Sequence, residues 1–114
     1  IPMSFLHYPV GLFFNRLRKH TEGFNLAYAE QFKKALSIPV ICVGGFLTKP
    51  SIEGALRDGR CDAVSVGRAM IADPYLYRHL LEDRPGPQCS FCNGCIARWS
   101  TLPVNCFDVK VRPE

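Results

Sequence analysis

Apolar side chains recur at intervals of three and four residues in the stretch from Phe24 to Leu36, and this spacing predicts an amphipathic helix. Asn25 is a suitable N-cap residue. Lys33 and Lys34 suit the C-terminal end, where the helix dipole favours positive charge. The apolar side chains that define the pattern are Leu26, Ala29, Phe32, Ala35 and Leu36.

Two short apolar runs, at residues 40–43 and 63–66, predict β-strands. Both are rich in β-branched residues, both are apolar apart from Ser65 in the second, and each ends at a glycine. Short, largely apolar runs of this kind are typical of parallel strands that are buried on both faces. We therefore expect two buried parallel strands.

Helix signals follow each of these strands. Thr48 can cap a helix in which Pro50 suits the first turn and Gly59 marks the end. After the second strand, a short helix is expected to begin near Arg68. A further helix should follow Asp73, which we take as its cap.

The order of the elements indicates an α/β fold, because strands that alternate with helices form parallel sheets. A short helix at residues 12–19 is also expected. Two strand–helix units cannot close a sheet. We therefore predict that residues 1–83 are the end of a larger α/β fold, for which a barrel is one candidate. Residues 84–114 form a cysteine-rich extension.

Composition narrows the class of protein. The 114 residues suit a single domain, with 47% hydrophobic and 21% charged residues and a net charge of +4. The basic residues are too dispersed for a nucleic-acid site, no apolar run approaches the roughly 20 residues of a membrane span, and no signal peptide is recognisable. We expect a cytoplasmic protein. Because it begins without methionine, we expect a fragment, and a processed chain is the alternative.

Glycines follow both predicted strands, as Gly44 and Gly45 after the first and Gly67 after the second. Glycine lets backbone N–H groups approach a phosphate closely, and Arg68 adds a positive charge at the start of a helix. In TIM barrels, phosphate sites often form after the last two strands. The alternative is that these glycines serve only tight turns.

Six cysteines in a cytosolic chain favour metal or redox chemistry over disulfides. Three are spaced as in ferredoxin-type clusters and a fourth follows after ten residues, which favours a [4Fe-4S] cluster over zinc. Zinc, disulfides and unliganded thiols remain alternatives. Cys42 and Cys61 lie in or beside the strands, and we interpret both as structural. The four candidate ligands are Cys89, Cys92, Cys95 and Cys106.

The stretches "IPVICVGGF" and "CDAVSVGRAMIADPYLYRHL" resemble the last two strand–helix units of the old yellow enzyme family of FMN-dependent NAD(P)H:flavin oxidoreductases. The tail "CSFCNGCIARW" is similar to the branch with a [4Fe-4S] cluster after the barrel, which includes trimethylamine dehydrogenase and 2,4-dienoyl-CoA reductase. The resemblance implies that residues 1–83 are the C-terminal part of a (β/α)8 TIM barrel, its last two strand–helix units. It also implies that the four cysteines of the tail are cluster ligands. It also implies an FMN phosphate site formed by Gly44, Gly45, Phe46, Gly67 and Arg68.

The function implied by this resemblance is an FMN-dependent oxidoreductase that uses NAD(P)H and a small substrate of the enoyl, enone or amine type. Such a protein needs no nucleic acid or membrane, and a homo-oligomer is compatible with it. No catalytic residue is assigned, because the parts of the barrel that protonate a substrate are not in this sequence. The alternatives are a zinc-binding interaction module without catalysis, and a barrel end that binds a sugar or nucleotide phosphate.

Overall fold

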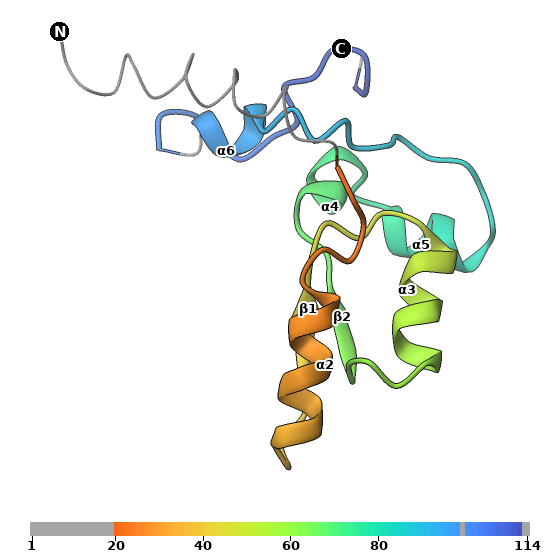
Figure 1. The fold of residues 1–114 in the computed structure, drawn as a ribbon. Helices are drawn as coiled ribbons and strands as arrows, with labels where there is room; N and C mark the ends of the chain where they lie inside the picture. The colour runs from red at the N-terminus through yellow and green to blue at the C-terminus, as the bar shows by residue number, and fades with distance from the viewer. Residues whose placement is uncertain (1–19, 99, 113–114) are drawn as a thin grey trace, which may run out of the picture.

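The computed structural model describes residues 20–98 and 100–112, and the helix expected at residues 12–19 lies outside them. Helices and strands alternate as the sequence predicts (Figure 1). In order, the elements are α2 (Leu26–Ala35), β1 (Ile41–Val43), α3 (Lys49–Arg57), β2 (Ala63–Ser65), α4 (Arg68–Ala72), α5 (Leu76–Leu81) and α6 (Gly94–Arg98).

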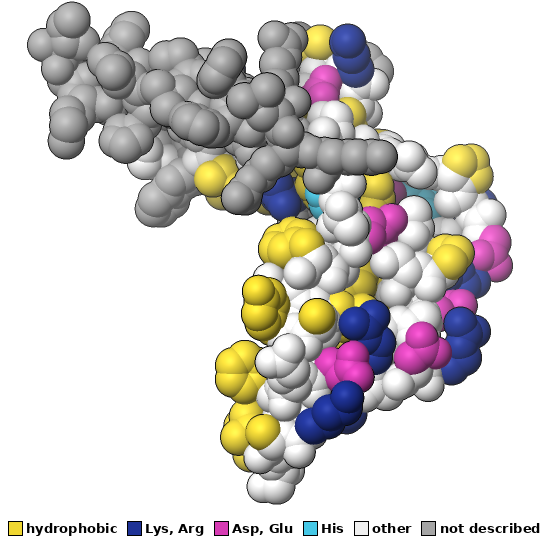
Figure 2. Space-filling view, in the orientation of Figure 1, with side chains coloured by type: hydrophobic (Ala, Val, Ile, Leu, Met, Phe, Trp, Pro, Cys, Tyr) yellow, Lys and Arg dark blue, Asp and Glu magenta, His cyan; other side chains and the backbone are white. Residues whose placement is uncertain are grey.

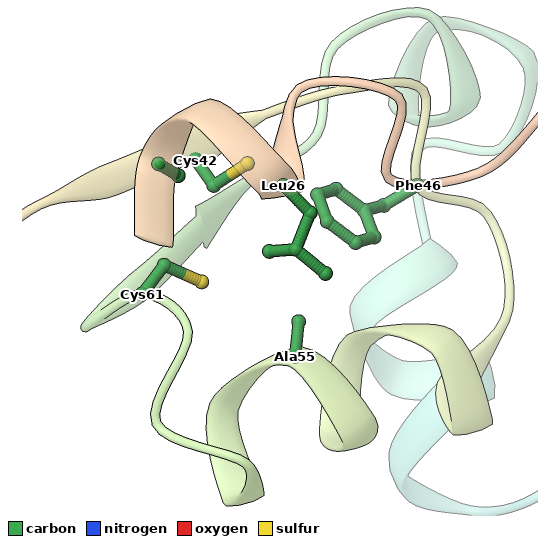
Figure 3. Packing of buried hydrophobic residues seen from close by; sticks show 6 residues of the cluster. Leu26, Cys42, Phe46, Ala55 and Cys61 are labelled. Atoms are coloured by element: carbon green, nitrogen blue, oxygen red, sulfur yellow. The ribbon is translucent and has the colours of Figure 1, made fainter. Parts of the chain in front are cut away.

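The two strands pair in parallel, with Ile41 opposite Ala63 and Val43 opposite Ser65. Helix α2 packs against β1, and α3 packs against β2. A small core lies between these helices and the strands, and Figure 3 shows several of its side chains pointing toward one another. The buried members are Leu26, Ala29, Cys42, Phe46, Ala55 and Cys61.

Each strand is covered on one face only. Cys42 points into the core and is 2% exposed, whereas its neighbours Ile41 and Val43 are 66% and 57% exposed. The prediction that β1 is buried on both faces is therefore wrong for this chain. The physical reason is that no element of the described residues covers the outer face of the two-stranded sheet.

A second uncovered apolar surface lies along α2. The apolar positions that predict this helix are buried only in part, because Leu26 and Ala29 face the core whereas Phe32 and Leu36 are exposed. Figure 2 shows hydrophobic side chains gathered on the side of the molecule where Figure 1 places α2 and β1. Exposed side chains recur every four residues along a line that we call the α2 stripe: Phe24, Tyr28, Phe32 and Leu36.

The predicted helix caps act differently from expectation. The side chain of Asn25 does not cap α2 but donates from Nδ2 to the carbonyl oxygen of Val43, 2.7 Å away. The side chain of Thr48 does not cap α3 either. The carboxylate of Glu22 instead accepts hydrogen bonds from the N–H groups of Leu47 (2.7 Å) and Thr48 (2.9 Å) and from the Thr48 hydroxyl (3.0 Å).

Cys42 and Cys61 are structural, as predicted, and each is 2% exposed. Burial raises the pKa of both thiols. The neighbouring Cys61 raises that of Cys42 further, and Asp62 does the same for Cys61. Both therefore stay protonated and serve as small hydrophobic side chains of the core.

A linker without helix or strand runs from α5 to α6 and passes over a buried acid. Asp73 is 1% exposed, and its Oδ2 lies 2.6 Å from His79 Nδ1. Its Oδ1 accepts the N–H of Tyr75 at 3.0 Å, so Asp73 supports the turn before α5 rather than capping the helix at its first residue. Gly86 of the linker lies so close that a Cβ atom there would collide with both Asp73 and His79.

No helix of the described residues is long and apolar enough to span a membrane.

Replacing Glu22 with alanine is expected to lower the free energy of unfolding by about 1 kcal/mol, since the start of α3 loses its acceptor. Burial acts to raise the pKa of Glu22, but the hydrogen bonds from Thr48, Leu47 and Ser51 outweigh it, so the pKa lies below the ordinary value of 4.5. The stabilisation is therefore complete above that value and is lost as the pH falls through the lowered pKa. Urea unfolding followed by circular dichroism should show the gap between variant and wild type closing in acid. Glu53→Ala, at an exposed position of α3, is the control.

The α2 stripe is expected to make the isolated chain self-associate and bind a hydrophobic dye, because exposed apolar surface of this extent is rarely stable in water. Phe32→Glu should reduce dye fluorescence and shift the sedimentation profile toward the monomer. Ala27→Glu, exposed on the same helix but outside the stripe, should change little. A wild-type chain that sediments as a monomer without binding dye would contradict the expectation.

Candidate cofactor site

The two glycine turns lie side by side because of the strand pairing. Gly44 follows β1 directly, and Gly67 comes two residues after β2. The carboxyl ends of paired parallel strands meet at one edge of the sheet. The structure thus brings together two turns that are separated by a whole helix in the sequence.

The first turn is closely packed by the segment that precedes α2. The carbonyl oxygen of Gly44 accepts the N–H groups of Gly23 (2.7 Å) and Phe24 (3.2 Å). A Cβ atom on Gly44 would lie 3.1 Å from the backbone nitrogen of Asn25, so a side chain there would crowd the backbone. Gly44 is therefore required by packing within the chain.

Gly45 needs glycine for two reasons. Its φ is +68°, a conformation that other residues rarely adopt, and a Cβ atom would collide with the ring of His20. His20 Nε2 lies 2.9 Å from the carbonyl oxygen of Gly45. The third residue of this turn, Phe46, is 1% exposed and its side chain belongs to the core, so only its backbone faces the turn.

The second turn is open. A Cβ atom on Gly67 would meet no atom within 4 Å, and Gly67 is the N-terminal cap of α4. The first N–H groups of a helix have no partner inside the helix. Arg68, the first residue of α4, brings a half-buried guanidinium to the same end. This donor set of free N–H groups beside a fixed cation fits a phosphate.

Arg68 is held by the segment that carries the cysteines. Its Nη1 donates to Oδ1 of Asn93, and its guanidinium carbon lies 4.9 Å from the ring centre of Phe91. The ring of Phe91 also stacks on His20, with 3.4 Å between ring centres and 11° between planes. The two glycine turns and the cysteine-bearing segment therefore meet at Phe91.

The four candidate cysteine ligands are close in sequence but are not assembled around one point. All six cysteines are free, and no three His, Cys, Asp or Glu side chains among residues 20–98 and 100–112 are placed to hold a metal ion. Backbone N–H groups do point at two of the sulfurs. The N–H of Phe91 donates to Cys89 Sγ and that of Gly94 to Cys92 Sγ, both at 3.4 Å.

Cys89 is the candidate ligand with the most perturbed surroundings. Burial raises the pKa of its thiol, and Cys95 and Cys92 raise it slightly further, while the Phe91 N–H and the charge of Arg68 act to lower it. Cys89 is therefore within electrostatic reach of two other candidate ligands and of Arg68.

Three residues of this site were missed by reasoning from the sequence: His20, Phe91 and Asn93. Phe91 and Asn93 have φ values of +55° and +59°. Asparagine tolerates this conformation better than most residues, so Asn93 between two cysteines carried a weak signal of a tight loop. Nothing in the sequence indicated that His20 or Phe91 would contact a glycine turn.

Comparison with protein families and with known proteins finds relatives of this chain. Residues 16–103 match the family model of dihydrouridine synthase (Dus). A bilirubin reductase from Mediterraneibacter gnavus is 40% identical over 75 residues, which are 63% of this chain and 12% of that protein. An NADH oxidase from Thermoanaerobacter brockii is 40% identical over 78 residues, 66% of this chain and 12% of that protein. A dimethylamine dehydrogenase from Hyphomicrobium sp. is 32% identical over 74 residues, 63% of this chain and 10% of that protein.

The matched segment is thus only about an eighth of the length of the first two relatives. No solved structure matches the chain. The family model covers most of the chain, including both strands, both glycine turns and the first three cysteines of the tail. The chain therefore belongs to the dihydrouridine synthase family, whose members are FMN-binding TIM barrels.

Proposed function

We propose that this chain is the C-terminal part of an FMN-dependent oxidoreductase barrel and that it holds the phosphate of FMN. The observation that carries the proposal is the open end of α4, where Gly67 leaves space and Arg68 supplies a cation. The backbone of the neighbouring turn, Gly44, Gly45 and Phe46, completes the site in the assembled barrel. The uncovered face of β1 and the α2 stripe support a larger fold, since the missing strands and helices would cover them.

FMN, when bound, accepts and donates hydride or single electrons, which is the chemistry expected with NAD(P)H and a small enoyl, enone or amine substrate. The residues of this chain bind the phosphate of FMN and thereby orient the cofactor. Arg68 balances the charge of the phosphate, and Gly67, which leaves open space, lets backbone donors approach it. No catalytic step is assigned to the described residues.

For the tail we propose that Cys89, Cys92, Cys95 and Cys106 are ligands of a [4Fe-4S] cluster. The spacing of the first three supports this, as do the two N–H groups directed at sulfur, because such hydrogen bonds are found around clusters and tune their potential. Bringing the four sulfurs together requires the loop to close around the metal. Zinc at the same cysteines is the alternative, and it would make the tail a structural module.

A dihydrouridine synthase that reduces uridine in a nucleic acid is the rival function, favoured by the name of the family. The surface charges argue against it. A surface that binds a polyanion needs basic side chains that are not neutralised. In residues 26–84, which we call the α/β unit, most basic side chains are paired with carboxylates. The paired residues are Lys33, Lys34, Lys49, Arg57, Arg60 and Arg84. We also propose that the protein works in the reducing cytoplasm, where cysteines more often bind metal or stay as thiols than form disulfides.

Arg68→Ala in the complete protein is expected to weaken FMN binding by about tenfold or more, since a charge-assisted contact to phosphate is lost. FMN occupancy after gel filtration, read from the flavin absorbance, measures this. Arg57→Ala removes an exposed arginine at the far end of α3 and is the matched control. Full FMN occupancy in Arg68→Ala would show that the phosphate binds elsewhere.

Iron and acid-labile sulfide in the complete protein, purified without oxygen, are expected at about four of each per chain. Cys92→Ser should abolish both, while Cys42→Ser, in the core, should leave them in place. Flavin released from the same sample by denaturation should be FMN. Zinc without flavin would favour the structural module, and FMN without iron would limit the proposal to the barrel.

A further inference from the structure

We propose that Phe91 and Asn93 of the cysteine-bearing loop are positioning residues that hold Arg68 in place for the phosphate of FMN. The loop is thereby a part of the phosphate site as well as a carrier of cysteines. This inference rests on the function proposed above and names two residues whose role is separate from that of Arg68.

The first argument is the charge of the partner. Other cations of the α/β unit, such as Lys33 and Arg60, are paired with carboxylates. Among residues 20–98 and 100–112, no carboxylate lies within ion-pair distance of Arg68. Its partners are the neutral amide of Asn93 and the neutral ring of Phe91. A neutral acceptor orients a guanidinium without cancelling its charge, so the full charge remains available to an anion.

The second argument is geometry. An arginine side chain loses much rotamer freedom when it is fixed, and a site that fixes it beforehand binds more tightly. Asn93 anchors one nitrogen of the guanidinium, and Phe91 provides a surface for its plane. The exposed Gly67 side of α4 is left open to a ligand.

The third argument is backbone strain. Phe91 and Asn93 both have positive φ, and two such residues within three positions cost energy unless the surroundings enforce them. Their side chains make the contacts that do so. Phe91 contacts Arg68 on the β2 side and stacks on His20, which contacts Gly45 on the β1 side. The strained loop therefore reaches both glycine turns.

The test is the binding of FMN and of riboflavin, which lacks the phosphate, to the complete protein after removal of its flavin. Asn93→Gly removes the amide and keeps a residue that adopts positive φ freely. It should weaken FMN binding about tenfold and change riboflavin binding by less than about twofold. Asn93→Asp keeps an acceptor but adds a negative charge, so it should weaken FMN at least as much and again spare riboflavin.

Phe91→Leu should produce a smaller loss that is also confined to FMN. Phe107→Leu is its matched control, because Phe107 lies under Arg98, at 4.8 Å, as Phe91 lies under Arg68. Iron, sulfide and the near-ultraviolet dichroism of the same samples verify that each variant is folded and that its loop is intact.

The outcomes separate the positioning role of Phe91 and Asn93 from the phosphate site at Arg68. Wild-type FMN affinity in both Asn93 variants would overturn the positioning role, while a loss in Arg68→Ala alone would leave the phosphate site standing. Equal loss of FMN and riboflavin in Asn93→Gly would also overturn it, because that result marks a general structural role. Wild-type FMN affinity in Arg68→Ala would overturn the phosphate site itself.

Discussion

The parallel pairing of β1 with β2 is the constraint on which the rest of the structure depends. In that register, the paired residues Cys42 and Val64 point toward the helices. The pairs on either side of them point to the uncovered face of the sheet: Ile41 with Ala63, and Val43 with Ser65. The core forms on the first side. The same pairing brings the carboxyl ends of both strands to one edge, so two glycine turns from distant parts of the sequence share a site. A shift of one residue would exchange the faces and expose Cys42 to water.

Electrostatics divides the molecule into two regions. Over α2, α3 and the strands, carboxylates neutralise the basic side chains, and Glu22 uses its charge to bind the backbone before α3. At the edge of the sheet, the partners of Arg68 among the described residues are all neutral. Carboxylates thus neutralise the basic side chains in the region that only stabilises the fold. The positive charge of Arg68 stays unneutralised at the edge where we expect the phosphate to bind.

Much of the fold was predictable from local pattern. The two strands, the helices that follow them and the glycine that ends α3 appear within a residue or two of their expected positions, because apolar runs and turn residues act over short distances. Contacts between distant segments were not predictable. Glu22 replaced Thr48 as the cap of α3, and His20 and Phe91 joined the glycine turns, through contacts that span about 25 residues or more. Which of the apolar side chains of α2 are buried was not predictable either, because only tertiary packing decides between them.

Gly86 limits which insertions and deletions the linker between α5 and α6 can accept. At Gly86 the linker lies so close to the Asp73–His79 pair that only a hydrogen atom fits, and this contact fixes the backbone between α5 and the cysteines. An inserted or deleted residue on either side of that point would shift Cys89 relative to Arg68, although the linker has no regular structure and looks tolerant. Among relatives of this chain, we expect insertions and deletions to be rare in this linker and more frequent between α6 and Cys106. Among the described residues of that second segment, no glycine contact of this kind fixes the backbone.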